Sequence, residues 1–159
     1  MEKKKNDFIA QGSILAIASI LVRVMGMIYR IPMTAIIGDK GNGFYSYAYS
    51  VYTILLLLSS YSLPLAVSKM VSAKAQLGQW RNVKRVFICA IAFAIGIGTT
   101  FGLIVLIGAQ FFTRVFFHSE LAAIALRFMA PTILIMALLG VFRGFFQGLQ
   151  NTLPTAVSQ

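Results

Sequence analysis

The sequence predicts an all-α integral membrane protein. Hydrophobic residues make up 58% of the 159 residues and charged residues only 11%, whereas soluble domains are about 45–50% apolar and about 25% charged. The mean hydropathy is +0.82, and most charged residues fall in short stretches between long apolar ones. Because about 20 apolar residues are enough for a helix to cross a bilayer, we expect a chain built of transmembrane helices.

Four apolar stretches are long enough to span a membrane, and a fifth begins near the last residue. We place the four spans at about residues 8–37, 43–68, 86–113 and 121–149, and the beginning of the fifth at about residue 153. Pro154 suits the first turn of a new helix. We therefore interpret residues 1–159 as a fragment that breaks off as its fifth span begins.

Glycine and proline mark the places where these helices should end or bend. The segment GDKGNG at residues 38–43 predicts a turn between the first two spans. Pro64 should kink or end the second span, and Pro131 should do the same in the fourth. The polar residues 69–85 predict a connector between the second and third spans.

Glycines at intervals of four residues indicate close helix packing. Gly140, Gly144 and Gly148 share one face of the fourth predicted span, and Gly98 and Gly102 repeat this spacing in the third. Small residues with this spacing let the backbones of two membrane helices approach closely. The pattern supports helix packing and says little about a substrate.

The distribution of basic residues predicts that both termini are cytoplasmic. Short cytoplasmic loops of membrane proteins carry an excess of Lys and Arg. With the N-terminus inside, the outer side holds two basic residues, Lys40 and Arg114. The cytoplasmic side then holds nine: Lys3, Lys4, Lys5, Lys69, Lys74, Arg81, Lys84, Arg85 and Arg143. We expect a multi-pass protein of the cell membrane with a cytoplasmic N-terminus.

Three arginines inside the predicted spans are the candidate functional residues: Arg23, Arg30 and Arg127. Arg23 and Arg30 are seven residues apart, nearly two helical turns, so they share a helix face. No Asp or Glu lies in residues 8–37, and a cation in hydrocarbon usually faces a protein interior or a watery cavity. Guanidinium groups bind phosphate oxygens in pairs, which favours an anionic passenger. Pairing with carboxylates elsewhere, bonding to carbonyls and snorkelling to the interface are the structural alternatives.

The composition argues against an enzyme, a metal centre and a nucleic-acid-binding protein. The chain has a single cysteine, Cys89, and a single histidine, His118, and its acids are not clustered. We therefore expect no catalytic residues, no metal site and no cofactor. A net charge of +10 would indicate nucleic acid in a soluble protein. Here the charges flank apolar spans, so membrane lipid is the expected partner.

Three segments resemble a known family, the polysaccharide and lipid-linked oligosaccharide exporters. Residues 21–30, LVRVMGMIYR, resemble the first helix of these exporters, and residues 63–69, LPLAVSK, resemble the end of the second. The segment RGFFQG at 143–148, followed by Pro154, Thr155 and Ala156, resembles the junction of the fourth and fifth helices. The chain is similar in particular to the stage V sporulation protein B branch, which is related to lipid II flippases and to multidrug and toxin extrusion proteins.

This resemblance implies a fold and a role for the arginines. Family members have twelve to fourteen helices in two lobes around a central cavity, and this chain matches the first part of the N-terminal lobe. In lipid II flippases, arginines of the first helix face the cavity and engage the substrate diphosphate. Arg23, in an Arg-x-x-Gly context with Gly26, matches such a position, and Arg30 matches it less closely. Arg127 matches no motif and is a candidate only as an intramembrane cation.

The implied function is the export or flipping of lipid-linked polysaccharide or peptidoglycan precursors. The substrate would be a lipid-linked anionic glycan, and a missing C-terminal lobe or an oligomer partner would complete the transporter. One alternative is a multidrug exporter of the same superfamily, which would need membrane acids for cation coupling. Asp7, Asp39 and Glu120 lie instead at span edges or in loops. The other alternative is a small four-helix membrane scaffold or assembly protein, whose glycine stripes would serve oligomerisation.

Overall fold

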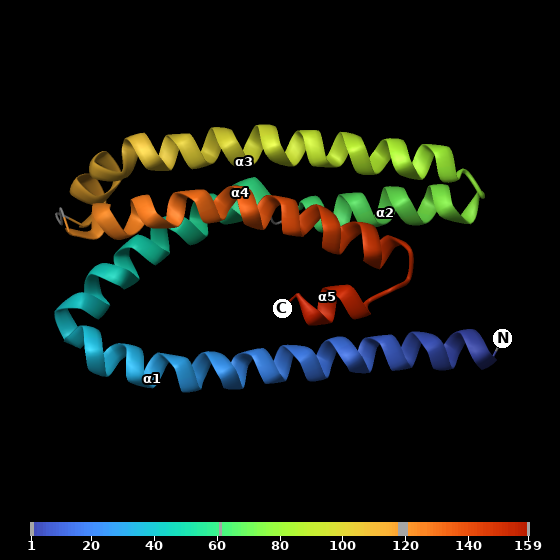
Figure 1. The fold of residues 1–159 in the computed structure, drawn as a ribbon, viewed down its shortest axis with the longest axis horizontal. Helices are drawn as coiled ribbons and strands as arrows, with labels where there is room; N and C mark the ends of the chain where they lie inside the picture. Colours follow the sequence, from blue (N-terminus) through green and yellow to red (C-terminus); the bar gives the residue numbers. More distant parts are fainter. Residues whose placement is uncertain (1, 61, 118–120, 159) are drawn as a thin grey trace.

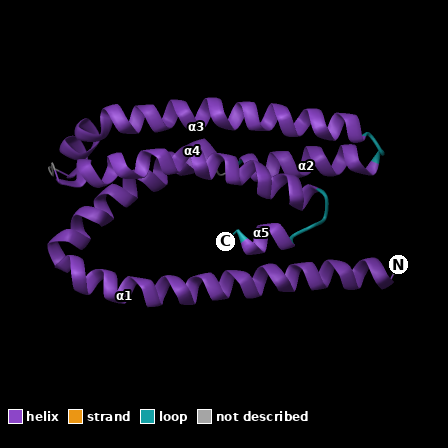
Figure 2. Cartoon of the chain, in the orientation of Figure 1, coloured by secondary structure: helices purple, strands orange, loops and turns teal. Residues whose placement is uncertain are grey.

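The computed structural model describes residues 2–60, 62–117 and 121–158. These residues form helices and short turns and contain no β-strand, which confirms the all-α prediction (Figure 2). The helices are α1 (Glu2–Ser60), α2 (Leu63–Gln76), α3 (Trp80–Phe117), α4 (Leu121–Gly148) and α5 (Leu153–Val157). Figure 1 shows α2, α3 and α4 side by side, with the N-terminal half of α1 on the far side of α5.

Helix α1 changes direction at a single glycine. Its backbone is helical from Glu2 to Ser60 except at Gly38, where φ is 71° and ψ is 175°. Glycine reaches a positive φ at little cost because it has no Cβ. In Figure 1 the N-terminal half of α1 runs along one edge before the chain turns back to the other helices. The predicted turn over residues 38–43 is therefore wrong in extent, since residues 39–43 are helical and Gly38 alone interrupts the helix.

Pro64 and Pro131 differ in their effect on the helices. Helix α1 ends at Ser60, and α2 begins at Leu63 with Pro64 in its first turn, where a missing N–H costs nothing. The prediction that Pro64 coincides with a helix end is confirmed. Pro131 lies inside α4, which continues to Gly148, so of the two predicted effects, a kink or a helix end, the helix end does not occur. Membrane helices tolerate an internal proline when neighbouring groups satisfy the freed carbonyl.

The connector predicted at residues 69–85 is mostly helical. Only Leu77–Gln79 form a turn, in which Gly78 has a φ of 68°. The backbone N–H of Gly78 donates to the Ala75 carbonyl at 3.0 Å, and that of Gln79 donates to the Lys74 carbonyl at 3.0 Å. These two bonds satisfy carbonyls at the end of α2, as in the usual glycine-terminated helix. The polar segment therefore turns the chain directly from α2 into α3.

Helix α4 is the centre of the fold and contacts each of the other four helices. Its buried residues belong to two apolar clusters. The first joins α4 to α3 and to the second half of α1, around Leu126, Val105 and Val51. The second joins α4 to α2 and α3, around Val141 and Val67.

The glycine stripes lie at the closest helix contacts. A Cβ added to Gly144 would lie 2.8 Å from the Cα of Pro64, and one added to Gly148 would lie 2.8 Å from the Cβ of Val71. A Cβ at Gly98 of α3 would lie 3.0 Å from the Cα of Leu134 of α4. Van der Waals packing between close backbones is a main source of helix association in membranes. The predicted packing role is confirmed for Gly144, Gly148 and Gly98.

Among the described residues, three helices are long and apolar enough to cross a membrane. The candidate spans are Gly12–Leu57 in α1, Trp80–Val115 in α3 and Ala122–Gly148 in α4. The sequence predicted four spans, but the first span and most of the second lie in one helix that is bent at Gly38, and the second continues into α2. Helix α2 has 14 residues, so it measures about 21 Å and is shorter than the hydrocarbon core of about 30 Å.

Candidate functional site

The three predicted arginines lie on two helices. Arg23 and Arg30 lie on the N-terminal half of α1, and Arg127 lies near the beginning of α4. All three side chains are exposed. The structure therefore keeps Arg23 and Arg30 on one helix face and presents Arg127 on a different element.

The helix surface around Arg23 and Arg30 is apolar and exposed. Ile20, Met27 and Ile31 are 61%, 65% and 71% exposed. In the candidate span Gly12–Leu57, the most apolar window of 18 residues contains no residue that is buried against the rest of the described chain. An anion at this face would meet two cations in apolar surroundings, where charges attract more strongly than in water.

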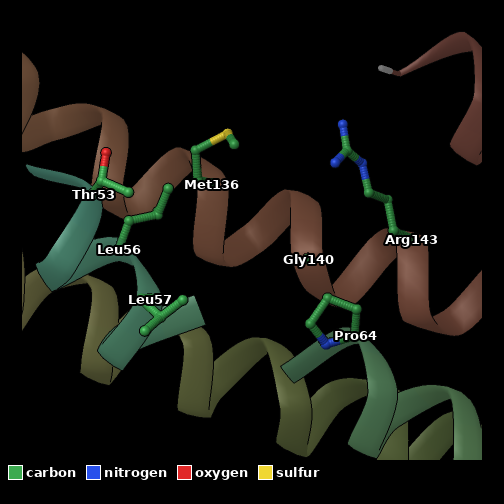
Figure 3. Close-up of a pocket in the computed structure, with 7 residues that line it drawn as sticks. All are labelled: Thr53, Leu56, Leu57, Pro64, Met136, Gly140 and Arg143. Carbon is green, nitrogen blue, oxygen red and sulfur yellow. The ribbon is translucent and has the colours of Figure 1, made fainter. Parts of the chain in front are cut away.

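A pocket of about 400 Å³ lies between the second half of α1, the beginning of α2 and the middle of α4. Its lining is largely apolar and consists of Thr53, Leu56, Leu57, Pro64, Met136, Gly140 and Arg143. Figure 3 shows the Arg143 side chain extending from α4 at one end of the pocket, with Thr53 and Met136 toward the other. None of the three predicted arginines lines this pocket.

Arg143 is held in place by the end of α5. Its Nε donates a hydrogen bond to the Ser158 Oγ at 3.0 Å, and its Nη2 donates one to the Ser158 carbonyl oxygen at 2.6 Å. The Ser158 hydroxyl donates in turn to the Thr155 carbonyl at 2.9 Å. Both acceptors of the guanidinium are neutral, so these bonds orient its charge without neutralising it.

Arg143 was not predicted as a site residue. In the sequence it is one of the nine predicted cytoplasmic cations and part of the segment RGFFQG that resembles the family, and neither observation gives it a role in a site. One signal could have identified it: Arg143 lies between Gly140 and Gly144 on a largely apolar helix. Glycines leave room beside a long side chain, but only the fold shows that this room is a pocket between three helices.

Helix α5 connects the two parts of the molecule. It lies between α4 and the N-terminal half of α1 in Figure 1, and it contacts both α1 and α4. Thr155 of α5 is only 2% exposed, and its hydroxyl oxygen has no hydrogen-bond partner among the described residues. Helix α5 therefore lies between the half of α1 that carries Arg23 and Arg30 and the helices that line the pocket. Its buried side chain, Thr155, is polar.

Comparisons with known proteins show a matching family model and similar bacterial proteins. A family model described as polysaccharide biosynthesis protein matches residues 8–159. The chain is 27% identical over 154 residues to lipid II flippase MurJ of Bacillus subtilis, covering 92% of this chain and 28% of the flippase. It is also 27% identical over 155 residues to stage V sporulation protein B of the same organism, covering 98% of this chain and 30% of that protein.

A third relative is described only by its location. The chain is 28% identical over 156 residues to the uncharacterized membrane protein YabM of Bacillus subtilis, covering 98% of this chain and 28% of that protein. The chain thus spans less than a third of the length of these relatives. No solved structure matches it. The apolar helices and the match over residues 8–159 agree with the resemblance seen in the sequence, and the chain belongs to the polysaccharide biosynthesis protein family.

Proposed function

We propose that this chain is the N-terminal part of a flippase for lipid-linked, phosphate-bearing glycan precursors. The observation that carries the proposal is the pair Arg23 and Arg30 on an exposed apolar helix face, in a chain similar to a lipid II flippase. In this proposal both arginines bind the head-group phosphates of the substrate, and Arg127 contributes a third cation. Helices beyond this chain or an oligomer partner complete the transporter.

We also propose that the chain crosses the membrane four times and begins a fifth span in α5. The candidate span Gly12–Leu57 has 46 residues and would measure roughly 70 Å as a straight helix, more than twice the hydrocarbon thickness of about 30 Å. The bend at Gly38 supports two crossings by this helix. The excess of basic residues supports a cytoplasmic N-terminus.

A chimera tests the proposed flippase activity. Residues 8–159 would replace the matching segment of lipid II flippase MurJ, and lipid II export would be followed by its accessibility to a membrane-impermeant reagent. We expect the chimera to export lipid II and Arg23→Ala in it to abolish export. Arg23→Lys should retain partial activity because an ammonium lacks the bidentate geometry of guanidinium. Arg30→Ala should be milder, since Arg30 lies nearer the predicted outer interface.

Insertion and folding provide the control for this test. Arg23→Ala should leave expression near normal, because a cation at mid-bilayer costs at least about 2.5–3.5 kcal/mol on insertion scales. Export by the Arg23→Ala chimera at the unsubstituted rate would refute the phosphate assignment. Loss of the folded protein would instead indicate a buried ion pair. Residues 1–159 expressed alone should not support export, and complementation by them would favour a self-sufficient oligomer.

Thiol labelling tests the orientation. In a Cys89→Ser background, single cysteines at the exposed residues Lys40 and Gln79 lie on opposite sides of the proposed membrane. A membrane-impermeant thiol reagent applied to intact cells should label Lys40→Cys and leave Gln79→Cys unlabelled until the cells are opened. The reverse pattern would place the N-terminus outside. Labelling of both or neither would contradict the proposed spans.

The multidrug and scaffold alternatives have less support. Relatives named for lipid II flipping and sporulation favour a lipid-linked substrate. The glycines that a scaffold would use for oligomerisation already pack α4 against α2 and α3 within the chain. We therefore carry only the flippase proposal forward.

A further inference from the structure

Arg143 and the apolar pocket beside it form a second place where an anion could be held, separate from Arg23 and Arg30. The pocket is walled by Leu56 and Leu57 of α1, Pro64 of α2 and Met136 of α4. Its volume of about 400 Å³ falls within the range of about 300–1,000 Å³ common for ligand sites. Figure 3 shows a single guanidinium at one end of this apolar lining.

The two hydrogen bonds of Arg143 have the arrangement that a ligand phosphate would use. Its Nε and Nη2 point to the two oxygens of Ser158, at 3.0 and 2.6 Å. Two adjacent N–H groups of a guanidinium match two oxygens of a phosphate, and a phosphate brings the negative charge that the neutral oxygens of Ser158 lack. A phosphate can therefore replace Ser158 on the same two donors and neutralise the charge that Ser158 leaves uncompensated.

Thr53, the other polar residue of the lining, is already satisfied. Its hydroxyl donates to the Tyr49 carbonyl of its own helix at 2.8 Å. The pocket therefore offers one charged end and an apolar body. A free phosphate would use only the charged end, and an uncharged lipid would use only the apolar body.

We propose that this pocket binds a phosphate that is attached to a single apolar chain. The phosphate lies on Arg143 in place of Ser158, and the chain lies against Leu56, Leu57 and Met136. This inference rests on the proposed function, because a lipid-linked glycan precursor supplies both parts of such a ligand. Arg143 lies five residues before the end of α4 at Gly148, so the phosphate would sit near a membrane interface, where lipid head groups lie.

Photo-crosslinking of an alkyl phosphate tests the site directly. The chain would be placed in phosphatidylcholine nanodiscs with dodecyl phosphate that carries a diazirine near the chain end. We expect cross-links at Leu56, Leu57 or Met136, with competition by unlabelled dodecyl phosphate. Dodecanol or inorganic phosphate should compete at least about tenfold less well, because each lacks one half of the ligand.

Three variants and a matched control identify the residues responsible. Arg143→Gln should weaken binding about tenfold or more, whereas Arg85→Gln, which removes an exposed cation from α3, should not. Leu57→Trp should reduce cross-linking by filling the pocket while Arg143 remains. Ser158→Ala should tighten binding about two- to tenfold, because one acceptor that competes for the guanidinium is lost.

Several outcomes would overturn the inference. One is that the Arg143→Gln variant binds dodecyl phosphate as tightly as the unsubstituted chain. The others are that dodecanol or inorganic phosphate competes as well as unlabelled dodecyl phosphate. If Arg143→Gln does not fold, unchanged cross-linking in both Leu57→Trp and Ser158→Ala would overturn it. The assay requires no transport, so it is independent of the chimera test. An inactive chimera with intact cross-linking would refute the proposed function alone, and an active chimera without cross-linking would refute this site alone.

Discussion

The N-terminal half of α1 and the bundle of α2, α3 and α4 are both apolar, yet only the bundle is packed. In the most apolar 18-residue window of each candidate span, 0% is buried in α1, 22% in α3 and 33% in α4. Both regions contain glycines. A Cβ at Gly26 of α1 would meet nothing within 4 Å, whereas one at Gly144 of α4 would meet the backbone of Pro64.

This difference shows what builds a helical membrane protein. Lipid tails are as apolar as leucine, so an apolar surface alone gives a helix no reason to pack against another. The bundle associates where small residues let backbones approach. The N-terminal half of α1 lacks such a contact in the described chain and carries Arg23 and Arg30 instead. Three stability predictions test this comparison, from the largest expected effect to the smallest.

Truncating a core side chain should show the largest difference between the regions. Leu126 is 0% exposed and Ile20 is 61% exposed. Leu126→Ala should reduce the free energy of unfolding by about 2–5 kcal/mol, through lost contacts and a residual cavity. Ile20→Ala should change it by less than about 0.5 kcal/mol. Unfolding in mixed micelles with increasing denaturing detergent measures both, and similar losses would mean that the N-terminal half of α1 is packed too.

Adding one methyl group at a glycine should have the next largest effect. Gly144→Ala would place its Cβ 2.8 Å from the Cα of Pro64, which should cost about 1–3 kcal/mol as α2 and α4 move apart. Gly26→Ala has free space and should gain up to about 1 kcal/mol from helix propensity. Thermal unfolding of the two variants in one detergent compares them. A neutral Gly144→Ala would contradict the backbone contact.

A backbone substitution at the junction of α4 and α5 should have the smallest effect. Gln150 has a φ of 61°, which is unusual for a residue other than glycine. Gln150→Gly should relieve the cost of the positive φ, and it should lose part of this gain to the greater freedom of glycine in the unfolded chain. The net effect should be a rise of about 0.5–1 kcal/mol in the free energy of unfolding. Gln147→Gly, three residues earlier within α4, should instead lower it by about 1 kcal/mol. Equal effects of the two glycines, seen as equal shifts in thermal unfolding, would show that the positive φ carries no strain.

Much of the fold could be predicted from the sequence because the signals are local. Long apolar stretches predict membrane helices, and Pro64 marks a helix start through its own ring. The four-residue glycine spacing predicts a packing face because it reflects helical periodicity. The turn at residues 38–43 was overestimated, since glycine content shows where a helix can break but not how many residues must leave it. The sequence left open whether Pro131 kinks or ends its helix, because whether an internal proline ends a helix depends on its neighbours.

The candidate site divides in the same way. The cationic face of Arg23 and Arg30 follows from their spacing on one helix, so the sequence by itself determined it. The sequence also determined that the chain is apolar and helical and which faces carry the glycines. Only the tertiary structure decided which helices those faces meet and which apolar surface stays exposed. It also decided that Arg143 borders a pocket and bonds to Ser158. These depend on contacts between residues distant in the chain, such as Pro64 with Gly144, and local periodicity carries no information about such partners.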